Sequence, residues 1–178
     1  MNALESIISW RRYLRNRLHR VLQRAGWDAL NLAVKIGAED VSPVALVQDL
    51  DFTLLCQCNS IERYALKISD SRQRFRRSLL EHLPLDQGPD AFSDMLHEHY
   101  SMMMDFIGTL SLKDLDKTLE APMFKDSVTV QWILEFGSFY EQSVSSRIIT
   151  VLAMQNPVFR VPWPTTRFLK PVKKLDIQ

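Results

Sequence analysis

The sequence predicts an all-α protein, and three observations point to this fold class. Only five glycines occur among 178 residues. Apolar residues seldom alternate with the two-residue period that marks β-strands. In the stretch 127–154 they instead recur every three or four positions, as on one face of an amphipathic helix. That face consists of Ile133, Phe136, Tyr140, Val144, Ile148, Val151 and Leu152, and it requires a second layer of helices to cover it.

The first long helix is expected over residues 3–25. Gly26 follows it, in the position where a glycine commonly ends a helix with a left-handed backbone. Residues 27–37 are expected to contain a short helix. The buried face of the first helix consists of Leu4, Ile7, Ile8, Leu14, Leu18, Val21 and Leu22, and arginines fill much of the remainder.

A second long helix begins at Ser42 and Pro43, because serine caps helix N-termini well and proline suits the first helical position. It is expected to extend to about Ile68. Residues 69–83 either form a separate helix or continue the second one, and the sequence leaves both alternatives open. The clearest loop of the chain follows, over the segment PLDQGPD at residues 84–90.

A third long helix is expected from about Pro89 to Leu110, followed by a short helix or turn over residues 111–119. The helix over 127–154 is the fourth long one. One face of the third helix collects Phe92, Leu96, His99, Met103, Phe106 and Leu110. The alternative N-cap residues of the fourth helix are Asp126, Ser127 and Thr129.

The fourth helix should end near Gln155, because Pro157 disfavours a helical residue before it. We therefore divide the chain into a helical domain, residues 1–155, and an extended, basic, proline-rich C-terminal arm, residues 156–178. Large apolar side chains in the arm favour packing on the helices over free disorder. These anchors are Phe159, Trp163 and Phe168.

Basic residues are concentrated at the two ends of the chain, although the net charge is only +1. In the first helix six arginines accompany a single acidic residue, Glu5. Such ends could contact nucleic acid, an anionic membrane surface or a protein, or could fold back onto the acidic middle of the chain. The predicted basic surface of the first helix consists of Arg11, Arg12, Arg15, Arg17, Arg20 and Arg24.

Cys56 and Cys58 are two positions apart in a predicted helix, so their side chains point roughly 200° apart and are poorly placed to pair or to share a metal. Free thiols are typical of a reducing compartment, which predicts a cytoplasmic protein. No run of about 18 apolar residues is present, so we expect no transmembrane segment. The Arg-rich start leaves a mitochondrial presequence as an alternative.

Motifs with catalytic spacing are missing from the sequence, which has no glycine-rich phosphate loop, GxSxG, HExxH or CxxC. We therefore expect no cofactor. His97 and His99 would face opposite sides of a helix, so His99 is expected to be packed and hydrogen-bonded rather than bound to a metal. Most acidic residues are expected on solvated faces, since no ExxH pair accompanies them. Those considered are Asp49, Asp51, Glu62, Glu135 and Glu141.

Three segments, in this order, resemble the DinB-like superfamily of four-helix-bundle proteins. SPVALVQDLDFTLLCQCNSIERYA (Ser42–Ala65) is similar to the family's second helix, and LSLKDLDKTLEAP (Leu110–Pro122) is similar to the turn before its last helix. VTVQWILEFGSFYEQSVSSRI (Val128–Ile148) is similar to the last helix itself. Together they cover about a third of the chain. The resemblance implies a four-helix bundle, here with short extra helices and the C-terminal arm.

Active members of this superfamily hold a divalent metal with three histidines and commonly transfer or add a thiol such as bacillithiol or mycothiol. Carried over by position, the second-helix ligand falls on Asp49, and the last-helix pair falls on Tyr140 and Val144. Aspartate could bind a metal, but tyrosine is a poor ligand when unactivated and valine has no donor atom. The resemblance thus implies a degenerate member of the superfamily, with its metal site lost.

The sequence favours a non-catalytic binding or scaffold module, with a protein partner or a second copy of the chain bound through the bundle pocket or the basic ends. The competing hypothesis is an enzyme, a thiol transferase or a hydrolase-like protein, with a site rebuilt near Asp49, His99 and Glu141. The last two are also expected to line the pocket. A third hypothesis is nucleic-acid or membrane-surface binding through the Arg-rich first helix, which no helix-turn-helix or RNP-type motif accompanies.

Overall fold

The computed structural model describes residues 2–120 and 127–159. Within these residues the chain is mostly helical, which confirms the all-α prediction. Phe159, the first predicted anchor of the C-terminal arm, is partly buried against the apolar core. The rest of the arm, including Trp163 and Phe168, lies outside the described residues, so its packing stays a prediction.

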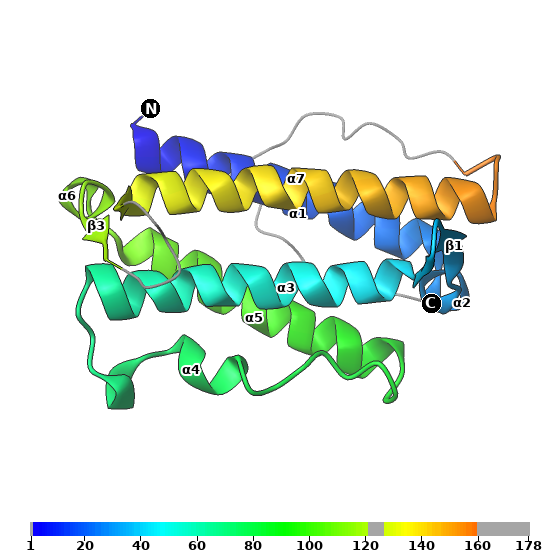
Figure 1. Ribbon diagram of the computed structural model, residues 1–178, viewed down its shortest axis with the longest axis horizontal. Helices are drawn as coiled ribbons and strands as arrows, with labels where there is room; N and C mark the ends of the chain where they lie inside the picture. Colours follow the sequence, from blue (N-terminus) through cyan, green and yellow to red (C-terminus); the bar gives the residue numbers. More distant parts are fainter. Residues whose placement is uncertain (1, 121–126, 160–178) are drawn as a thin grey trace.

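Four long helices form the body of the molecule: α1 (Ala3–Ala25), α3 (Pro43–Ser60), α5 (Pro89–Thr109) and α7 (Val130–Gln155). Figure 1 shows them lying roughly side by side along the long axis of the molecule. α7 packs against α1 and α3, and α5 packs against the same two helices. Each long helix therefore has two neighbours, and the apolar core lies between them.

Three boundaries of the long helices fall at residues that the sequence identifies as caps. Ser42 caps α3, and its hydroxyl accepts a hydrogen bond from the backbone N–H of Ala45. Thr129, one of three alternatives, caps α7 by accepting a hydrogen bond from the N–H of Trp132. Gly26 follows α1 with a φ of +78°, a conformation that favours glycine. These predicted boundaries are confirmed.

A β-hairpin that is not apparent from the sequence follows the short helix α2 (Trp27–Asn31). Its strands β1 (Val34–Ile36) and β2 (Glu39–Val41) pair antiparallel. Gly37 is the first residue of the two-residue turn and has a φ of +64°, in the left-handed region that glycine adopts without strain. The expected short helix is therefore present but ends early, and the rest of its segment pairs as strands.

The second long helix is slightly shorter than predicted. α3 ends at Ser60, and a single stretch of π-helix, Ile61–Ala65, follows it. Lys67 then has a φ of 55°, in the left-handed region, and the helix does not continue through it. The predicted end at Ile68 is therefore wrong by a few residues.

The helix expected over 69–83 forms only in part. A short turn of 3-10 helix, Asp70–Arg72, and the four-residue α4, Phe75–Ser78, take its place. The buried carboxylate of Glu62 accepts a hydrogen bond from the backbone N–H of Arg74 at 2.9 Å. This contact ties the segment to the end of the preceding helix, and local periodicity does not encode it.

The segment between α5 and α7 begins with α6 (Leu112–Leu115), which confirms the predicted short helix or turn. Ser111 and Asp114 form its capping box, in which the carboxylate accepts a hydrogen bond from the N–H of Ser111 at 2.8 Å. Strands β3 (Thr118–Leu119) and β4 (Val128–Thr129) pair antiparallel and lead into α7. This pairing is too short to leave a periodic signal in the sequence.

Gly137, in the first half of α7, lets side chains from two other helices meet over it. A Cβ atom at this position would collide with the guanidinium of Arg11 from α1 and the amide of Gln57 from α3. Gly108 in α5 differs, because within the described ranges, apart from its chain neighbours and the nearby backbone of its own helix, no atom lies within 4 Å of where its Cβ would be. The two glycines therefore allow the packing at α7 to be tested separately from helix propensity.

We expect Gly137→Ala to lower the free energy of unfolding by about 1–3 kcal/mol, because the added methyl group displaces the buried guanidinium of Arg11 from its hydrogen bond with the Leu134 carbonyl. Gly108→Ala is the matched control and should raise it by up to about 1 kcal/mol, because alanine favours helices over glycine. Urea denaturation followed by circular dichroism measures both values. A Gly137→Ala variant as stable as Gly108→Ala would show that α1, α3 and α7 do not meet at this position.

Candidate functional site

Two arginines of the predicted basic surface lie inside the protein instead. Arg11 and Arg15 are only 2% and 4% exposed. They share the buried face of α1 with Ile7, Leu14 and Leu18, because all five residues are spaced by helical steps. The prediction of a basic surface is therefore wrong for these two arginines. Of the other four, Arg12 and Arg17 are half-buried, and Arg20 and Arg24 are exposed.

Arg15 reaches across the interior from α1 to α7. Its Nε lies 3.4 Å from Oε1 of Glu141, and both side chains are almost completely buried. The guanidinium also lies over the ring of Tyr100 from α5, 4.4 Å from the ring centre, where the face of an aromatic ring attracts a cation. Three of the four long helices thus meet at one place. We define the buried polar cluster as Arg11, Arg15, Tyr100 and Glu141.

Arg11 connects the buried polar cluster to the backbone of α7. Its Nη2 donates a hydrogen bond to the carbonyl oxygen of Leu134 at 3.0 Å. The same carbonyl accepts a hydrogen bond from the hydroxyl of Ser138 at 3.1 Å. The missing side chain of Gly137 leaves the space through which the guanidinium reaches this carbonyl. Two arginines of α1 therefore contact α7. Arg11 binds a backbone carbonyl oxygen of this helix, and Arg15 pairs with the carboxylate of Glu141.

Burial is the main influence on the ionisable groups of the cluster. It raises the pKa of Glu141, and the positive charges of Arg15 and Arg11 oppose that rise. Burial also raises the pKa of Tyr100, an effect to which Glu141 adds and which the arginines oppose. The phenol is therefore neutral at physiological pH. For Glu141, the positive charges of Arg15 and Arg11 are what favour the ionised carboxylate in the interior, against the cost of burying its charge.

A second buried pair links α3 to α5. Oδ2 of Asp51 lies 2.6 Å from Nδ1 of His99, and each side chain is 3% exposed. His99 is thus packed and hydrogen-bonded, which confirms the expectation for this residue. The prediction that acidic residues are mostly solvated is wrong for Asp51, Glu62 and Glu141, which are all buried. Arg15 and Arg74 lie beside Glu141 and Glu62 and offset the cost of burying their charges, and His99 is the hydrogen-bond partner of Asp51.

The three positions matched to the family's metal ligands do not come together in the interior. Asp49 is exposed, Tyr140 is half-buried and Val144 is buried. The Tyr140 ring packs near Phe136, with the ring centres 6.5 Å apart. In α3 the carboxylate that points inward belongs to Asp51, because a shift of two residues turns a helical side chain by roughly 200°. Asp49 therefore does not lie in the helical interior.

The residues considered for a rebuilt enzyme site are also held apart. Asp49 lies at the surface, whereas His99 is bound to Asp51 and Glu141 to Arg15. Across residues 2–120 and 127–159, no three His, Cys, Asp or Glu side chains are grouped so that they could hold a metal ion. His99 and Glu141 take part in two separate buried pairs, and their place in a pocket stays a prediction.

The two cysteines are free thiols, as expected. Cys58 is buried, and burial raises its pKa to about 12. Cys56 is half-buried, and burial raises its pKa as well. Both thiols are therefore protonated at neutral pH, and a thiol is a much weaker nucleophile than a thiolate.

The exposed side of α7 carries a row of large aromatic side chains. Trp132, Phe136 and Phe139 are 46%, 44% and 70% exposed. The rings of Trp132 and Phe136 stack, with their centres 5.1 Å apart. The prediction that Phe136 belongs to the covered face is therefore wrong. Three small, exposed hydroxyl residues continue the row. We define the α7 outer face as Trp132, Phe136, Phe139, Ser143, Ser146 and Thr150.

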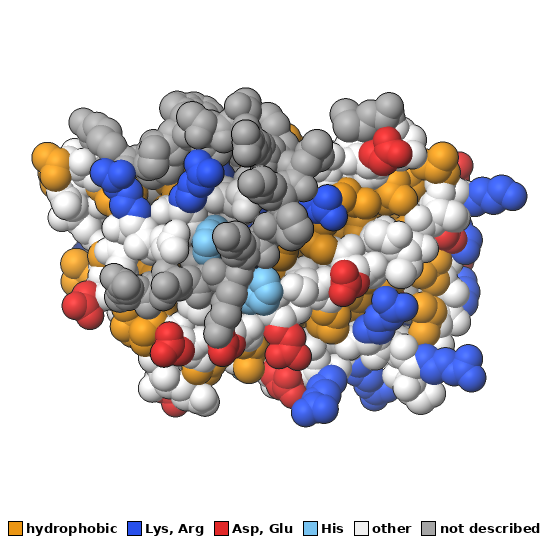
Figure 2. All heavy atoms as spheres, turned by 180° about the vertical axis from the view of Figure 1, so that it is seen from behind, with side chains coloured by type: hydrophobic (Ala, Val, Ile, Leu, Met, Phe, Trp, Pro, Cys, Tyr) orange, Lys and Arg blue, Asp and Glu red, His pale blue; other side chains and the backbone are white. Residues whose placement is uncertain are grey.

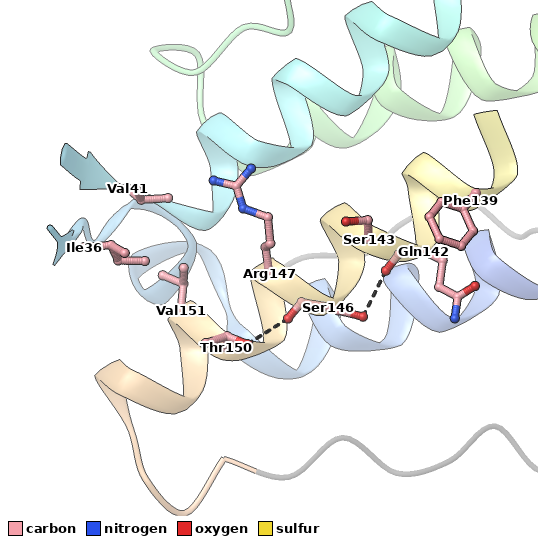
Figure 3. Close-up of a pocket in the computed structure, with 9 residues that line it drawn as sticks. All are labelled: Ile36, Val41, Phe139, Gln142, Ser143, Ser146, Arg147, Thr150 and Val151. Carbon is pink, nitrogen blue, oxygen red and sulfur yellow. Dashed lines mark hydrogen bonds between the residues drawn. The ribbon is translucent and has the colours of Figure 1, made fainter. Parts of the chain in front are cut away.

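Two hollows flank the α7 outer face, and Phe139 lines both of them. One, of about 590 Å³, follows the second half of α7 beside the β1–β2 hairpin (Figure 3). The other, of about 470 Å³, lies between the first halves of α1 and α7. The first is lined by Ile36, Val41, Phe139, Gln142, Ser143, Ser146, Arg147, Thr150 and Val151. The second is lined by Ala3, Ser6, Ile7, Trp10, Glu135, Ser138 and Phe139.

Trp132 and Phe139 were missed as surface residues at the sequence level. A signal for them was present, because neither falls on the apolar face predicted for this helix. Large aromatic side chains outside a buried stripe are uncommon without a role, since they leave apolar area in water. For Arg11 and Arg15 the signal was their position on the apolar stripe of the first helix.

Comparisons with known proteins give no match: no protein-family model, no curated protein and no solved structure matches the chain. None of the helices in the two described ranges combines the length and the hydrophobicity that crossing a membrane requires.

We expect Asp51→Ala to lower the free energy of unfolding by about 1–3 kcal/mol, because it leaves the buried His99 without its hydrogen-bond partner. Asp49→Ala is the matched control in the same helix and should change the value by less than about 0.5 kcal/mol, since Asp49 is exposed. Thermal or urea denaturation measures both. Equal effects of the two substitutions would show that α3 does not present Asp51 to the interior.

Proposed function

We propose that this protein is a non-catalytic binding module that holds an amphipathic helix of a protein partner against the α7 outer face. The observation that carries the proposal is the row of exposed aromatic rings between two hollows. Aromatic residues are enriched at the buried centres of protein interfaces and supply much of the binding energy there. Phe139 is the most exposed of the three rings, so it gains most from being covered.

The spacing of the α7 outer face suits a helix as the occupant. Its six residues follow one another in steps of four and three, which is the seven-residue repeat of a coiled-coil seam. Phe136, Ser143 and Thr150 occupy one core position of that repeat, and the other three residues occupy the second. An extended peptide would instead need the unpaired backbone groups of a sheet edge, which a helix surface does not offer.

We also propose that the four long helices form a DinB-like four-helix bundle that has lost the family's metal site. The chain order of α1, α3, α5 and α7 and their mutual packing support a bundle. Val144 has no donor atom and is buried in the apolar core, and Asp49 is exposed. These placements support loss of the site, and they favour binding over the family's thiol chemistry.

An enzyme remains the competing hypothesis, and it finds less support. A site rebuilt near Asp49, His99 and Glu141 would have to combine an exposed carboxylate with two residues that are engaged in separate buried pairs. Metal analysis of the purified protein checks it directly. One equivalent of Zn²⁺, Ni²⁺ or Fe, retained through purification, would favour the enzyme over the binding module.

Nucleic-acid or membrane-surface binding through α1 also finds less support. Two of the six arginines in this helix are buried, so they cannot contact a phosphate at the surface. On the described part of the surface seen in Figure 2, Lys and Arg side chains are interspersed with Asp and Glu side chains. An interspersed surface attracts polyanions less than a continuous basic one does.

Fluorescence anisotropy with a labelled helical peptide tests the proposed function. The peptide carries leucine at the core positions of about three heptads, with Glu and Lys elsewhere. A scrambled peptide of the same composition is the control. We expect the patterned peptide to bind with a dissociation constant in the micromolar range and the scrambled peptide to bind at least about tenfold more weakly.

Phe139→Glu should weaken binding of the patterned peptide by at least about tenfold, because it places a charge at the centre of the binding face. Leu80→Glu is the matched control, since Leu80 is also highly exposed but lies outside α7. It should leave the dissociation constant unchanged. Equal binding of the two peptides, or unchanged binding by Phe139→Glu, would contradict the proposed function.

A further inference from the structure

We propose that the helix bound by the α7 outer face is α7 of a second copy of the chain, packed antiparallel about a two-fold axis. This inference rests on the proposed function and names the partner. The axis lies at the level of residue 141, midway between the ends of the α7 outer face. In a two-fold dimer the same surface serves both protomers, so that surface has to be complementary to itself.

The two halves of the α7 outer face differ in size in the way that self-complementarity requires. Large rings occupy its first half and small hydroxyl residues occupy its second. Antiparallel packing places every ring against a small residue of the other protomer. It sets Trp132 opposite the partner's Thr150, Phe136 opposite the partner's Ser146 and Phe139 opposite the partner's Ser143. Parallel packing would oppose each ring with the same ring and leave the small residues facing one another.

The hollow beside the second half of α7 gives the partner's rings a place to enter. It has a volume of about 590 Å³, and Ile36 and Val41 of the hairpin form its apolar wall (Figure 3). The hydroxyls of Ser146 and Thr150 donate hydrogen bonds to the carbonyl oxygens one turn earlier in α7, at 2.9 and 3.0 Å. An aromatic ring can therefore cover these side chains without leaving a hydroxyl donor unpaired.

The charged residues on the exposed side of α7 lie beside the α7 outer face and not on it. Between Trp132 and Thr150, a stretch that is fully described, the exposed charged residues are Glu135 and Arg147. The acid lies in the first half and the base in the second. They lie on opposite flanks of the α7 outer face, so neither charge lies at the centre of the proposed contact.

The area available indicates a weak dimer. A buried aromatic side chain covers about 150–250 Å², and each ring of the α7 outer face is roughly half exposed. The rings of both protomers, with the surfaces that receive them, would then bury about 1,000–1,600 Å² in total, at the lower end of specific interfaces. We therefore expect a dimer dissociation constant in the micromolar range.

Sedimentation velocity of the full chain, from about 1 to 100 μM, tests for this dimer. We expect a concentration-dependent shift from the monomer mass to twice that mass. Phe139→Glu should raise the dissociation constant at least about tenfold by removing a ring, and Ser146→Phe should do so by filling the hollow. Leu80→Glu, exposed elsewhere, should leave it unchanged. Circular dichroism confirms that each variant is folded.

Distances between spin labels test the orientation. Met154→Cys in a Cys56→Ser background places one label at the exposed end of α7, while Cys58 is buried. Antiparallel packing about the level of residue 141 separates the two labels by about 39 Å, because each residue adds about 1.5 Å along a helix. Parallel packing would bring them to about 10 Å, the spacing of neighbouring helices.

The outcomes separate this inference from the proposed function. A chain that stays monomeric but binds the patterned peptide would overturn the self-association and leave the binding role standing. A chain that neither dimerises nor binds the peptide would overturn both. A dimer whose dissociation constant is unchanged by Phe139→Glu and Ser146→Phe would show that the copies do not associate through the α7 outer face. A distance of about 10 Å between the spin labels would show that the two α7 helices pack parallel.

Discussion

The ion pair between Arg15 and Glu141 constrains how α1 packs against α7, and the other contacts of the interior depend on that packing. Each charge loses several kcal/mol of solvation on burial, so neither is stable there without the other. α1 must therefore lie against α7 at this level. Tyr100 covers the guanidinium from α5, and Arg11 binds the α7 backbone nearby. Apolar packing alone would tolerate several alignments of these helices, whereas paired charges tolerate few.

The division between the two sides of α7 follows from this constraint. Its inner side is occupied by Glu141, Val144 and their neighbours, which pack into the core and hold α1 and α3. Its outer side keeps aromatic rings that the core does not use. Exposed apolar area of this kind lowers solubility unless another surface covers it. The helix that packs against both α1 and α3 thus also carries the face to which we assign the proposed binding.

The fold was largely predictable because helix periodicity and caps are local, as at Ser42 and Thr129. The course of the chain after α3 was not, since the contact between Glu62 and the backbone of Arg74 leaves no local pattern in the sequence. The site was predictable only in part. Arg15 lies on an apolar stripe, but charged residues are seldom buried without a partner, and its partner Glu141 lies far along the chain. Only tertiary structure shows that the two meet.

A double-mutant cycle on Arg15→Met and Glu141→Gln measures the central interaction most directly. Each substitution alone should lower the free energy of unfolding by about 3–5 kcal/mol, because it leaves an uncompensated charge or an unpaired polar group in the interior. The double variant should lose at least about 2 kcal/mol less than the sum of the single losses. Additive effects, within about 0.5 kcal/mol, would contradict the account by showing that the two side chains do not interact.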